Sequence, residues 1–192
     1  MLARPSADQI RSYLNEQQDK SFSYSEAGAT AQLPPEGYTA DHHRVQIGHG
    51  ESAYKSAIEA VLRWRMFDFD WIELCWPEAP VIEGTTVAIV ARHFGFWSIN
   101  SCRIVYVVNL ENGPIHKFGF AYGTLPDHAE RGEERFVVEW NQDDNSVWYD
   151  LLSFSKPNNL LVMFGYPLTR ALQKQFATDS MQAMTDAVKA SQ

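Results

Sequence analysis

The chain has 192 residues, of which 45% are hydrophobic and 21% charged, a composition that supports one sizeable core and excludes general disorder. The formal net charge is −8, and lysine and arginine form no run, which excludes a plain electrostatic footprint for nucleic acid or for an anionic membrane surface. No apolar stretch approaches the roughly 20 residues of a membrane span, and none near the start is typical of a signal peptide. We therefore expect a cytoplasmic protein with no nucleic-acid partner and no membrane insertion, and its oligomeric state stays unknown at this level.

The cysteines and histidines are not spaced as in a metal or redox site. Cys75 and Cys102 form no C-x-x-C pair, so we expect two buried free thiols. His42 and His43 are adjacent in a strand-like segment, where neighbouring side chains point to opposite faces, and His49 stands apart from them. We therefore expect no metal and no cofactor.

The N-terminal part predicts a helix followed by an extended arm. Ser6 is suited to cap a short helix. Residues 21–37 are rich in Ser, Gly, Ala and Pro, which is typical of an irregular segment. We expect residues 1–37 to form this helix and arm, and residues 38–192 to form a single α+β domain.

A strand and an amphipathic helix follow the arm. Apolar and polar residues alternate over 41–48, which indicates a strand, and Gly48 and Gly50 interrupt the alternation. Over 51–64, apolar residues recur at helical spacing and form one stripe. We interpret the glycine pair as a tight turn rather than a phosphate site, because Glu51 would repel an anion.

Strand-like runs come next. Six runs rich in β-branched and aromatic residues cover 71–76, 85–92, 98–110, 115–124, 134–141 and 147–155. The polar separators at 111–114 and 142–145 are typical of hairpins. Direct hairpin connections predict antiparallel pairing, because parallel strands need long crossovers.

The C-terminal part is helical again. Pro157 ends the last strand, and we expect a short helix to about Met163, a break at 165–166 and a restart with Pro167 in the first turn. The long helix from there to Val188 should lie across the sheet. The residues expected to face the sheet are Leu168, Leu172, Gln175, Phe176 and Ala183.

These elements predict the fold class. A run of antiparallel strands with helices gathered on one face defines an α+β layer architecture. We predict a curved antiparallel sheet of about seven strands packed on the long C-terminal helix. The order of elements resembles the helix-grip fold of birch-pollen-allergen-like proteins and START domains, and that resemblance implies a cavity between the sheet and the helix. A resemblance of fold pattern does not assign a function.

Three stretches resemble an uncharacterised bacterial and plant family, domain of unknown function 1990. They are residues 48–64, the segment FAYGTLPDHAERGEERF at 120–136, and residues 153–157 together with 166–168 and Gln173. The resemblance covers residues 24–180 and supplies no assigned reaction. This chain has Lys156 where the family pattern usually has arginine. Lysine lacks the planar fork of arginine, so an anion clamp at this position would be altered.

The segment from Tyr122 to Arg135 carries the densest set of reactive side chains. Strand alternation places Glu134 on the aromatic side of its strand and Glu133 on the opposite side. We expect the Glu134 carboxylate to reach the interior or the edge of a pocket and Glu133 to face water. A buried carboxylate needs a partner, and the candidates are Arg103, Tyr122 or a backbone amide. The alternative is a structural ion pair at the rim of the sheet.

The strand at 115–124 has rings on one face and small residues on the other. Small residues permit strong curvature or the close approach of another segment, and the rings suit the wall of an apolar cavity. The ligand-binding residues that we predict are Phe120, Tyr122, His128, Glu134 and Phe136.

The sequence supports no assignment of catalytic residues. His128 follows a turn, where a solvent-facing histidine is the simpler interpretation, although the adjacent Asp127 could orient it as a base. No G-x-S-x-G motif is present. Burial would nevertheless raise the pKa of Glu134 and suit it to acid–base chemistry.

Three functions remain open at this level. The leading hypothesis is the binding of a small apolar or amphipathic molecule between the sheet and the C-terminal helix. The first alternative is an enzyme of the cyclase, isomerase or hydrolase type that uses acid–base residues in the same cavity. The second is a structural or interaction module without a ligand. A cavity would separate the first two hypotheses from the last.

Overall fold

One antiparallel sheet forms the middle of the molecule. The computed structural model describes residues 1–158 and 166–191. Within them, seven strands pair in the order β1-β7-β6-β5-β4-β3-β2. The strands are β1 (Thr39–His49), β2 (Ile72–Cys75), β3 (Thr86–His93), β4 (Phe96–Leu110), β5 (Ile115–Thr124), β6 (Glu130–Asn141) and β7 (Ser146–Pro157). The predicted α+β class and antiparallel sheet are confirmed.

The helices begin where local chemistry allows. Before α1 (Ala7–Gln17), the Ser6 hydroxyl accepts from the Gln9 amide at 3.3 Å and the Gln9 side chain accepts from the Ser6 amide at 2.8 Å. This capping box confirms the predicted cap. The helix α2 (Gly50–Leu62) follows β1 directly, because Gly50 has a φ of +82° that turns the chain sharply. The expected tight turn is therefore confirmed.

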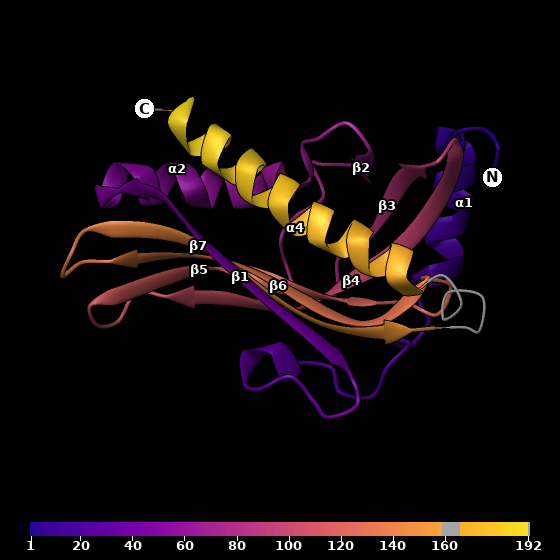
Figure 1. Cartoon of the computed structure of the whole chain (residues 1–192), viewed down its shortest axis with the longest axis horizontal. Coiled ribbons are helices and arrows are strands. Elements are labelled where there is room, and N and C mark those ends of the chain that lie inside the picture. Colours follow the sequence, from indigo (N-terminus) through magenta and orange to yellow (C-terminus); the bar gives the residue numbers. More distant parts are fainter. Residues whose placement is uncertain (159–165, 192) are drawn as a thin grey trace.

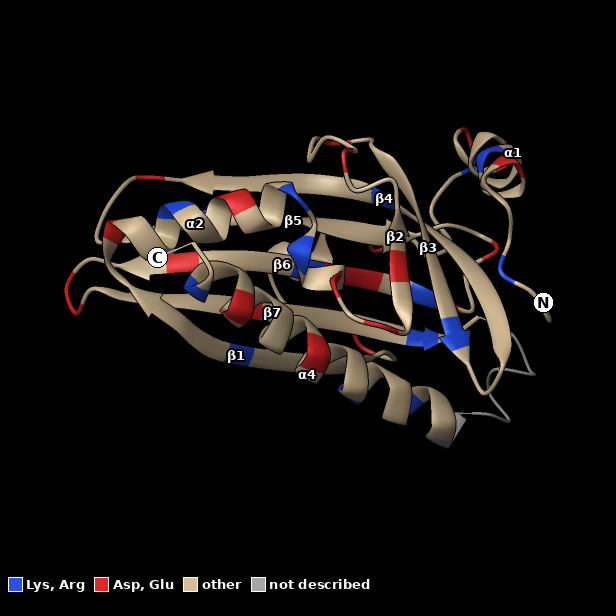
Figure 2. Ribbon diagram, turned by 90° about the horizontal axis from the view of Figure 1, so that it is seen from above, with Lys and Arg blue, Asp and Glu red and all other residues tan. Residues whose placement is uncertain are grey.

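Helices cover the inner face of the sheet, and the N-terminal arm crosses the outer face. Figure 1 shows α2 and α4 (Tyr166–Lys189) over one face, with the arm and its short helix η1 (Ala29–Ala31) beneath the other. Seen from above in Figure 2, charged residues of both signs are scattered along α2 and α4 without a basic stripe. None of the helices in the described residues has the length and apolar character needed to cross a membrane.

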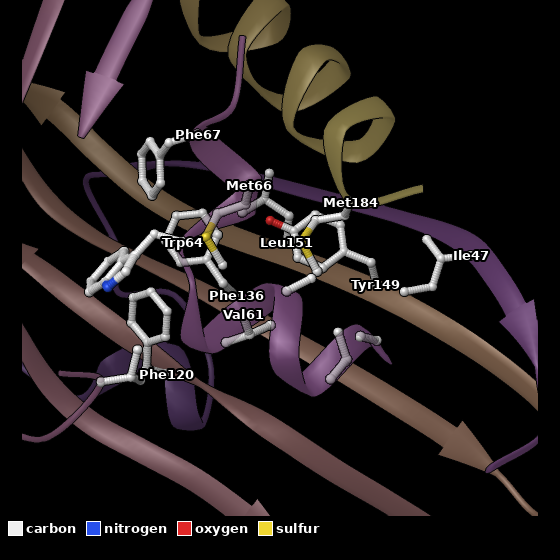
Figure 3. Close-up of a cluster of buried hydrophobic side chains, with 14 of the residues drawn as sticks. Ile47, Val61, Trp64, Met66, Phe67, Phe120, Phe136, Tyr149, Leu151 and Met184 are labelled. Atoms are coloured by element: carbon white, nitrogen blue, oxygen red, sulfur yellow. The ribbon is translucent and has the colours of Figure 1, made fainter. Parts of the chain in front are cut away.

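The main core lies between the inner face and the two helices. The turn η2 (Arg65–Phe67) after α2 inserts into this layer. Figure 3 shows the buried rings and methionines that fill it. The largest fully buried side chains of this core include Trp64, Tyr149, Phe120, Phe136, Met66 and Met184. Most of the aromatic excess of the sequence is therefore used in packing.

The outer face carries a second, smaller set of contacts. Ile10 of α1 packs with Cys75, Ala88 and Val90 on β2 and β3. Both cysteines are free and buried, as expected. Further along the arm, Tyr24 lies so close to Gly123 that a Cβ atom at this glycine would be 2.1 Å from the tyrosine oxygen. The small residues of β5 thus admit a second segment, which was one of the two predicted uses.

The long C-terminal helix is confirmed, but its buried face is only partly as predicted. Gln175 and Leu168 are exposed, Leu168 by 48%, and Leu172 is half-buried. The fully buried positions are Ala177, Ser180, Met184 and Val188. The Ser180 hydroxyl is within 2.9 Å of the Tyr149 hydroxyl, so the buried face of α4 includes a polar residue that is hydrogen-bonded. A search for apolar residues at helical spacing does not find this position.

The short helix predicted to end near Met163, and the break at 165, fall outside the described residues. The helix α4 begins at Tyr166, one residue before the predicted restart at Pro167.

Candidate functional site

A cavity of about 290 Å³ lies between the inner face of the sheet and α4. Its apolar lining includes Phe67, Trp71, Ile72, Ile89, Ala91, Leu151, Leu172, Phe176 and Ala177. Its polar lining includes Asp41, His43, His93, Ser98, Asn100, Tyr122, His128, Glu130, Glu134, Ser153, Ser155, Thr169 and Gln173. Apolar walls with a few convergent polar groups are typical of small-molecule sites.

Glu134 and Tyr122 form the polar pair on the sheet side of the cavity. They are partners in the pairing of β6 with β5, and the Tyr122 hydroxyl donates to the Glu134 carboxyl at 2.9 Å. Burial raises the pKa of Glu134 to about 8, and the nearby Glu130 and Asp41 carboxylates add to that effect. Glu134 is therefore mainly protonated at neutral pH, and Tyr122 is the neutral partner that the sequence analysis named as one candidate.

Glu133 does not face water, and that prediction is wrong. It is 2% exposed, because the N-terminal arm covers the outer face of the sheet at this point. Its carboxylate accepts hydrogen bonds from the Tyr24 hydroxyl at 2.7 Å, the Gly28 amide at 2.7 Å and the Thr30 amide at 2.9 Å, and another from the Thr30 hydroxyl. The two adjacent glutamates thus lie on opposite faces: Glu133 is buried beneath the arm, and Glu134 is half-buried and lines the cavity.

Arg103 is not the partner of Glu134. Its guanidinium donates to the carbonyl oxygens of Gln17, Gln18 and Lys20 at 3.0, 2.5 and 2.8 Å. It therefore holds the end of α1 and the start of the arm. Alternation cannot predict this role, because it depends on where a distant segment crosses the strand.

His128 lines the cavity instead of facing solvent. The Glu130 amide donates to its Nδ1 at 3.0 Å, so in the neutral ring the proton is on Nε2. Burial lowers the pKa of His128 to about 4. Asp127 does not orient the ring, because its carboxylate accepts from Lys20 at 3.0 Å and from Gln17.

A chain of polar side chains ties α4 to the sheet at one end of the cavity. Arg170 makes a two-pronged ion pair with Asp41 of β1 at 2.5 and 2.6 Å, and it also donates to Gln173. Gln173 donates in turn to Glu130 at 2.5 Å and to Ser155 at 2.8 Å. Asp41, Glu130 and Arg170 are not among the binding residues predicted from the sequence. The alternation of Glu130 with Glu134 across Gly132 was a signal that could have found one of them.

The predicted binding residues fall into two groups. Tyr122, His128 and Glu134 line the cavity. Phe120 and Phe136 are fully buried in the adjoining core. Their roles as ligand contacts stay predictions. The described residues contain no group of histidine, cysteine and acidic side chains that could hold a metal ion.

The curved antiparallel sheet, the C-terminal helix and the cavity between them define a helix-grip protein. The structure is similar to human STARD10, with a TM-score of 0.51 and 12% identity over 97% of this chain and 80% of that one. It is also similar to TTHA0849 from Thermus thermophilus, with a TM-score of 0.50 and 13% identity over 79% of this chain and 98% of that one. At these identities the likeness shows the fold alone.

Sequence places the chain more narrowly. Residues 23–183 match the family described as Domain of unknown function (DUF1990), and the chain belongs to this family. A UPF0548 protein of Dictyostelium discoideum is 36% identical, covering 98% of this chain and 95% of its own length. UPF0548 proteins of Arabidopsis thaliana and Deinococcus radiodurans are 31% and 32% identical, each over more than nine-tenths of both chains. The resemblance noted from three sequence stretches is confirmed.

Proposed function

We propose that this protein binds a small apolar or amphipathic molecule in the cavity between the sheet and α4. The observation that carries the proposal is the cavity of about 290 Å³ itself. A space of that size is far larger than the share of liquid volume, about 30 Å³, that one water occupies. Rings and aliphatic side chains form its walls, and such walls favour an apolar body over water.

The test fills the cavity with a larger side chain introduced on α4. Ala177 is 4% exposed and lines the cavity, whereas Ala171 lies on the exposed side of the same helix. We expect Ala177→Leu to abolish the binding of an apolar dye and of any molecule retained in native mass spectrometry. Ala171→Leu is the matched control and should bind as the wild type does.

Thermal unfolding of both variants separates loss of the cavity from loss of the fold. Leu172→Trp offers a second route, because Leu172 is half-buried and lines the cavity. Unchanged dye binding in folded Ala177→Leu and Leu172→Trp would overturn the proposal. So would a wild-type protein that retains no molecule under mild purification and binds neither apolar dyes nor lipids.

An acid–base enzyme is the second candidate, favoured by the Tyr122–Glu134 pair. A carboxyl group with a pKa of about 8 beside a phenol in a cavity can donate a proton at neutral pH. If the retained molecule is a substrate, prolonged incubation with wild-type protein should convert it into a species of altered mass or retention time. Glu134→Gln should then still bind it but leave it unchanged.

The remaining alternative, a module without a ligand, requires a filled interior, and the cavity is evidence against it. The cytoplasmic location stays a prediction. It draws support from the two free buried thiols, Cys75 and Cys102, which are typical of reducing compartments.

A further inference from the structure

The charged groups that line the cavity are of one sign. Carboxyl groups enter it from Asp41 of β1 and from Glu130 and Glu134 of β6. Within the described part of the chain, the cavity lining includes no lysine or arginine. Burial holds the pKa of His93 and His128 below the ordinary value of 6.5, so neither ring supplies a positive charge at neutral pH, and the third lining histidine, His43, acts on Asp41.

Asp41 is already neutralised by the protein. Arg170 of α4 contacts both of its oxygens, at 2.5 and 2.6 Å. The Arg170 guanidinium therefore holds the pKa of Asp41 below its usual value. Among the described residues, Glu130 and Glu134 are then the acids on this face that form no ion pair, although the Arg170 charge also lowers the pKa of Glu130.

Glu130 and Glu134 have neutral hydrogen-bond partners, and both line the cavity. Gln173 donates to one oxygen of Glu130, and Tyr122 donates to one oxygen of Glu134. The other oxygen of Glu130, Oε1, is buried and has no hydrogen-bond partner among the described residues. Gly132 lies between the two glutamates on β6 and also lines the cavity.

The pKa of each glutamate is raised above its ordinary value. Burial is the first cause of the raised pKa of each. For Glu130, Gln173 and Arg170 oppose that effect and Asp41 adds to it; for Glu134, the Tyr122 hydrogen bond opposes it, while Glu130 and Asp41 add to it. A buried carboxylate without a cation is costly, and Glu130 Oε1 in addition lacks a donor among the described residues.

We propose that the cavity selects amphipathic amines, with the ammonium group between Glu130 and Glu134 and the apolar part against Phe67, Leu172 and Phe176. The inference rests on the proposed function, since it names the chemical class of the same ligand. An ammonium group supplies a positive charge to the carboxyl groups that line the cavity. A carboxylate head group would instead add a further negative charge to this set of acids, and a hydroxyl would supply none of the positive charge that favours their ionised form.

Binding of an ammonium ion is coupled to proton release. Glu134 is mainly protonated at neutral pH in the free protein, and a bound cation favours its ionised form. The other groups that face it are Tyr122 of β5, Cys102 of β4, Tyr149 of β7, and Asp41 with its partner Arg170. Burial raises the pKa of Tyr122, Cys102 and Tyr149 above ordinary values that are already higher than 7. These groups therefore keep their protons near neutral pH, and the released proton comes from a glutamic acid.

The experiment compares three probes that share one tail: octylamine, octanol and octanoate. Calorimetric titrations near neutral pH, in two buffers with different ionisation enthalpies, measure affinity and proton release together. A charge-assisted hydrogen bond in a buried site corresponds to about ten- to a hundredfold in affinity. We expect octylamine to bind more tightly than octanol by that factor, octanoate to bind most weakly, and only octylamine to release a proton.

Two variants and a control locate the effect. Glu134→Gln should bring octylamine to within about threefold of octanol and remove the proton release, and Glu130→Gln should weaken octylamine selectively. Glu111→Gln, in an exposed loop, should behave as the wild type does. Using two variants guards against one of them failing to fold.

The outcomes separate this inference from the proposed function. If octanol binds and octylamine binds no tighter, or if octanoate is the preferred probe, the amine inference is overturned and the cavity remains a binding site. Selectivity that persists unchanged in both folded glutamine variants also overturns it. If none of the probes binds and no molecule is retained, both proposals are overturned.

Discussion

The Tyr24 hydroxyl donates a 2.7 Å hydrogen bond to the Glu133 carboxylate where the N-terminal arm crosses the outer face of the sheet. Two backbone amides of the arm, those of Gly28 and Thr30, donate to the same carboxylate. Because this side chain is 2% exposed, these donors replace the water that a carboxylate requires. One buried charge therefore fastens the arm to the sheet.

Loss of this contact should destabilise the protein. We expect Tyr24→Phe to lower the free energy of unfolding by about 1.5–3 kcal/mol, the usual range for a hydrogen bond to a charged group. Glu133→Gln should cost more, because it weakens several bonds at once. The measurement is urea-induced unfolding. The control is Tyr38→Phe, whose hydroxyl donates to the half-buried Glu26 and whose loss should change stability less. Equal effects of the two tyrosine variants would contradict the prediction.

Close contact between the arm and β5 leads to a second prediction. A Cβ atom at Gly123 would lie 2.1 Å from the Tyr24 oxygen, so Gly123→Ala should displace the arm and cost about 1–3 kcal/mol. Limited proteolysis should cut the arm faster in this variant. The same substitution should cost less in a Tyr24→Ala background, because the clash is then absent. An additive double-mutant cycle would show that the two residues are not in contact.

The raised pKa of Glu134 predicts a pH dependence of stability. In the folded protein the value is about 8, against an ordinary value of 4.5. The folded state therefore binds this proton more tightly than the unfolded state. The resulting stabilisation is fully present below the unfolded pKa and is lost as pH rises through the folded pKa. Glu134→Gln removes this dependence, so the variant should gain stability relative to the wild type between about pH 5 and about pH 8.

The difference in unfolding free energy between Glu134→Gln and the wild type should change by at most on the order of 1 kcal/mol per pH unit. Glu130 also has a raised pKa, but it is present in both proteins, and so is the Asp41–Arg170 pair. Urea unfolding at several pH values measures the difference. Glu111→Gln serves as an exposed control. A difference between variant and wild type that stays constant with pH would show that Glu134 titrates normally.

Three side chains on α4 should rank by burial. Met184 is fully buried, Leu172 is half-buried and Leu168 is 48% exposed. We expect Met184→Ala to cost about 2–5 kcal/mol and Leu172→Ala to cost less, because it already faces a cavity. Leu168→Ala should change stability by no more than about 0.5 kcal/mol. Urea unfolding tests the order. A larger loss of unfolding free energy for Leu168→Ala than for Met184→Ala would show that the buried face of α4 is assigned wrongly.

Local pattern predicted the elements of this fold well. Alternation, glycine and proline positions, and hairpin separators placed each strand of the described sheet and the start of α4 to within a few residues, because these signals act between near neighbours along the chain. The same alternation assigned Glu133 and Glu134 to opposite faces. It placed the Glu134 carboxyl inside the molecule with Tyr122 as a possible partner, because the strand period of two applies wherever a strand forms.

Tertiary structure decided what covers each face. The sequence pattern predicted that Glu133 faces water, but the arm crosses its strand and buries it. Arg103 donates hydrogen bonds to the end of α1 and the start of the same arm, and it does not line the cavity. Asp41, Arg170 and Glu130 meet at one end of the cavity although β1, β6 and α4 are far apart in the chain. Periodicity describes the faces of an element, and only the folded chain determines which segment lies against each face.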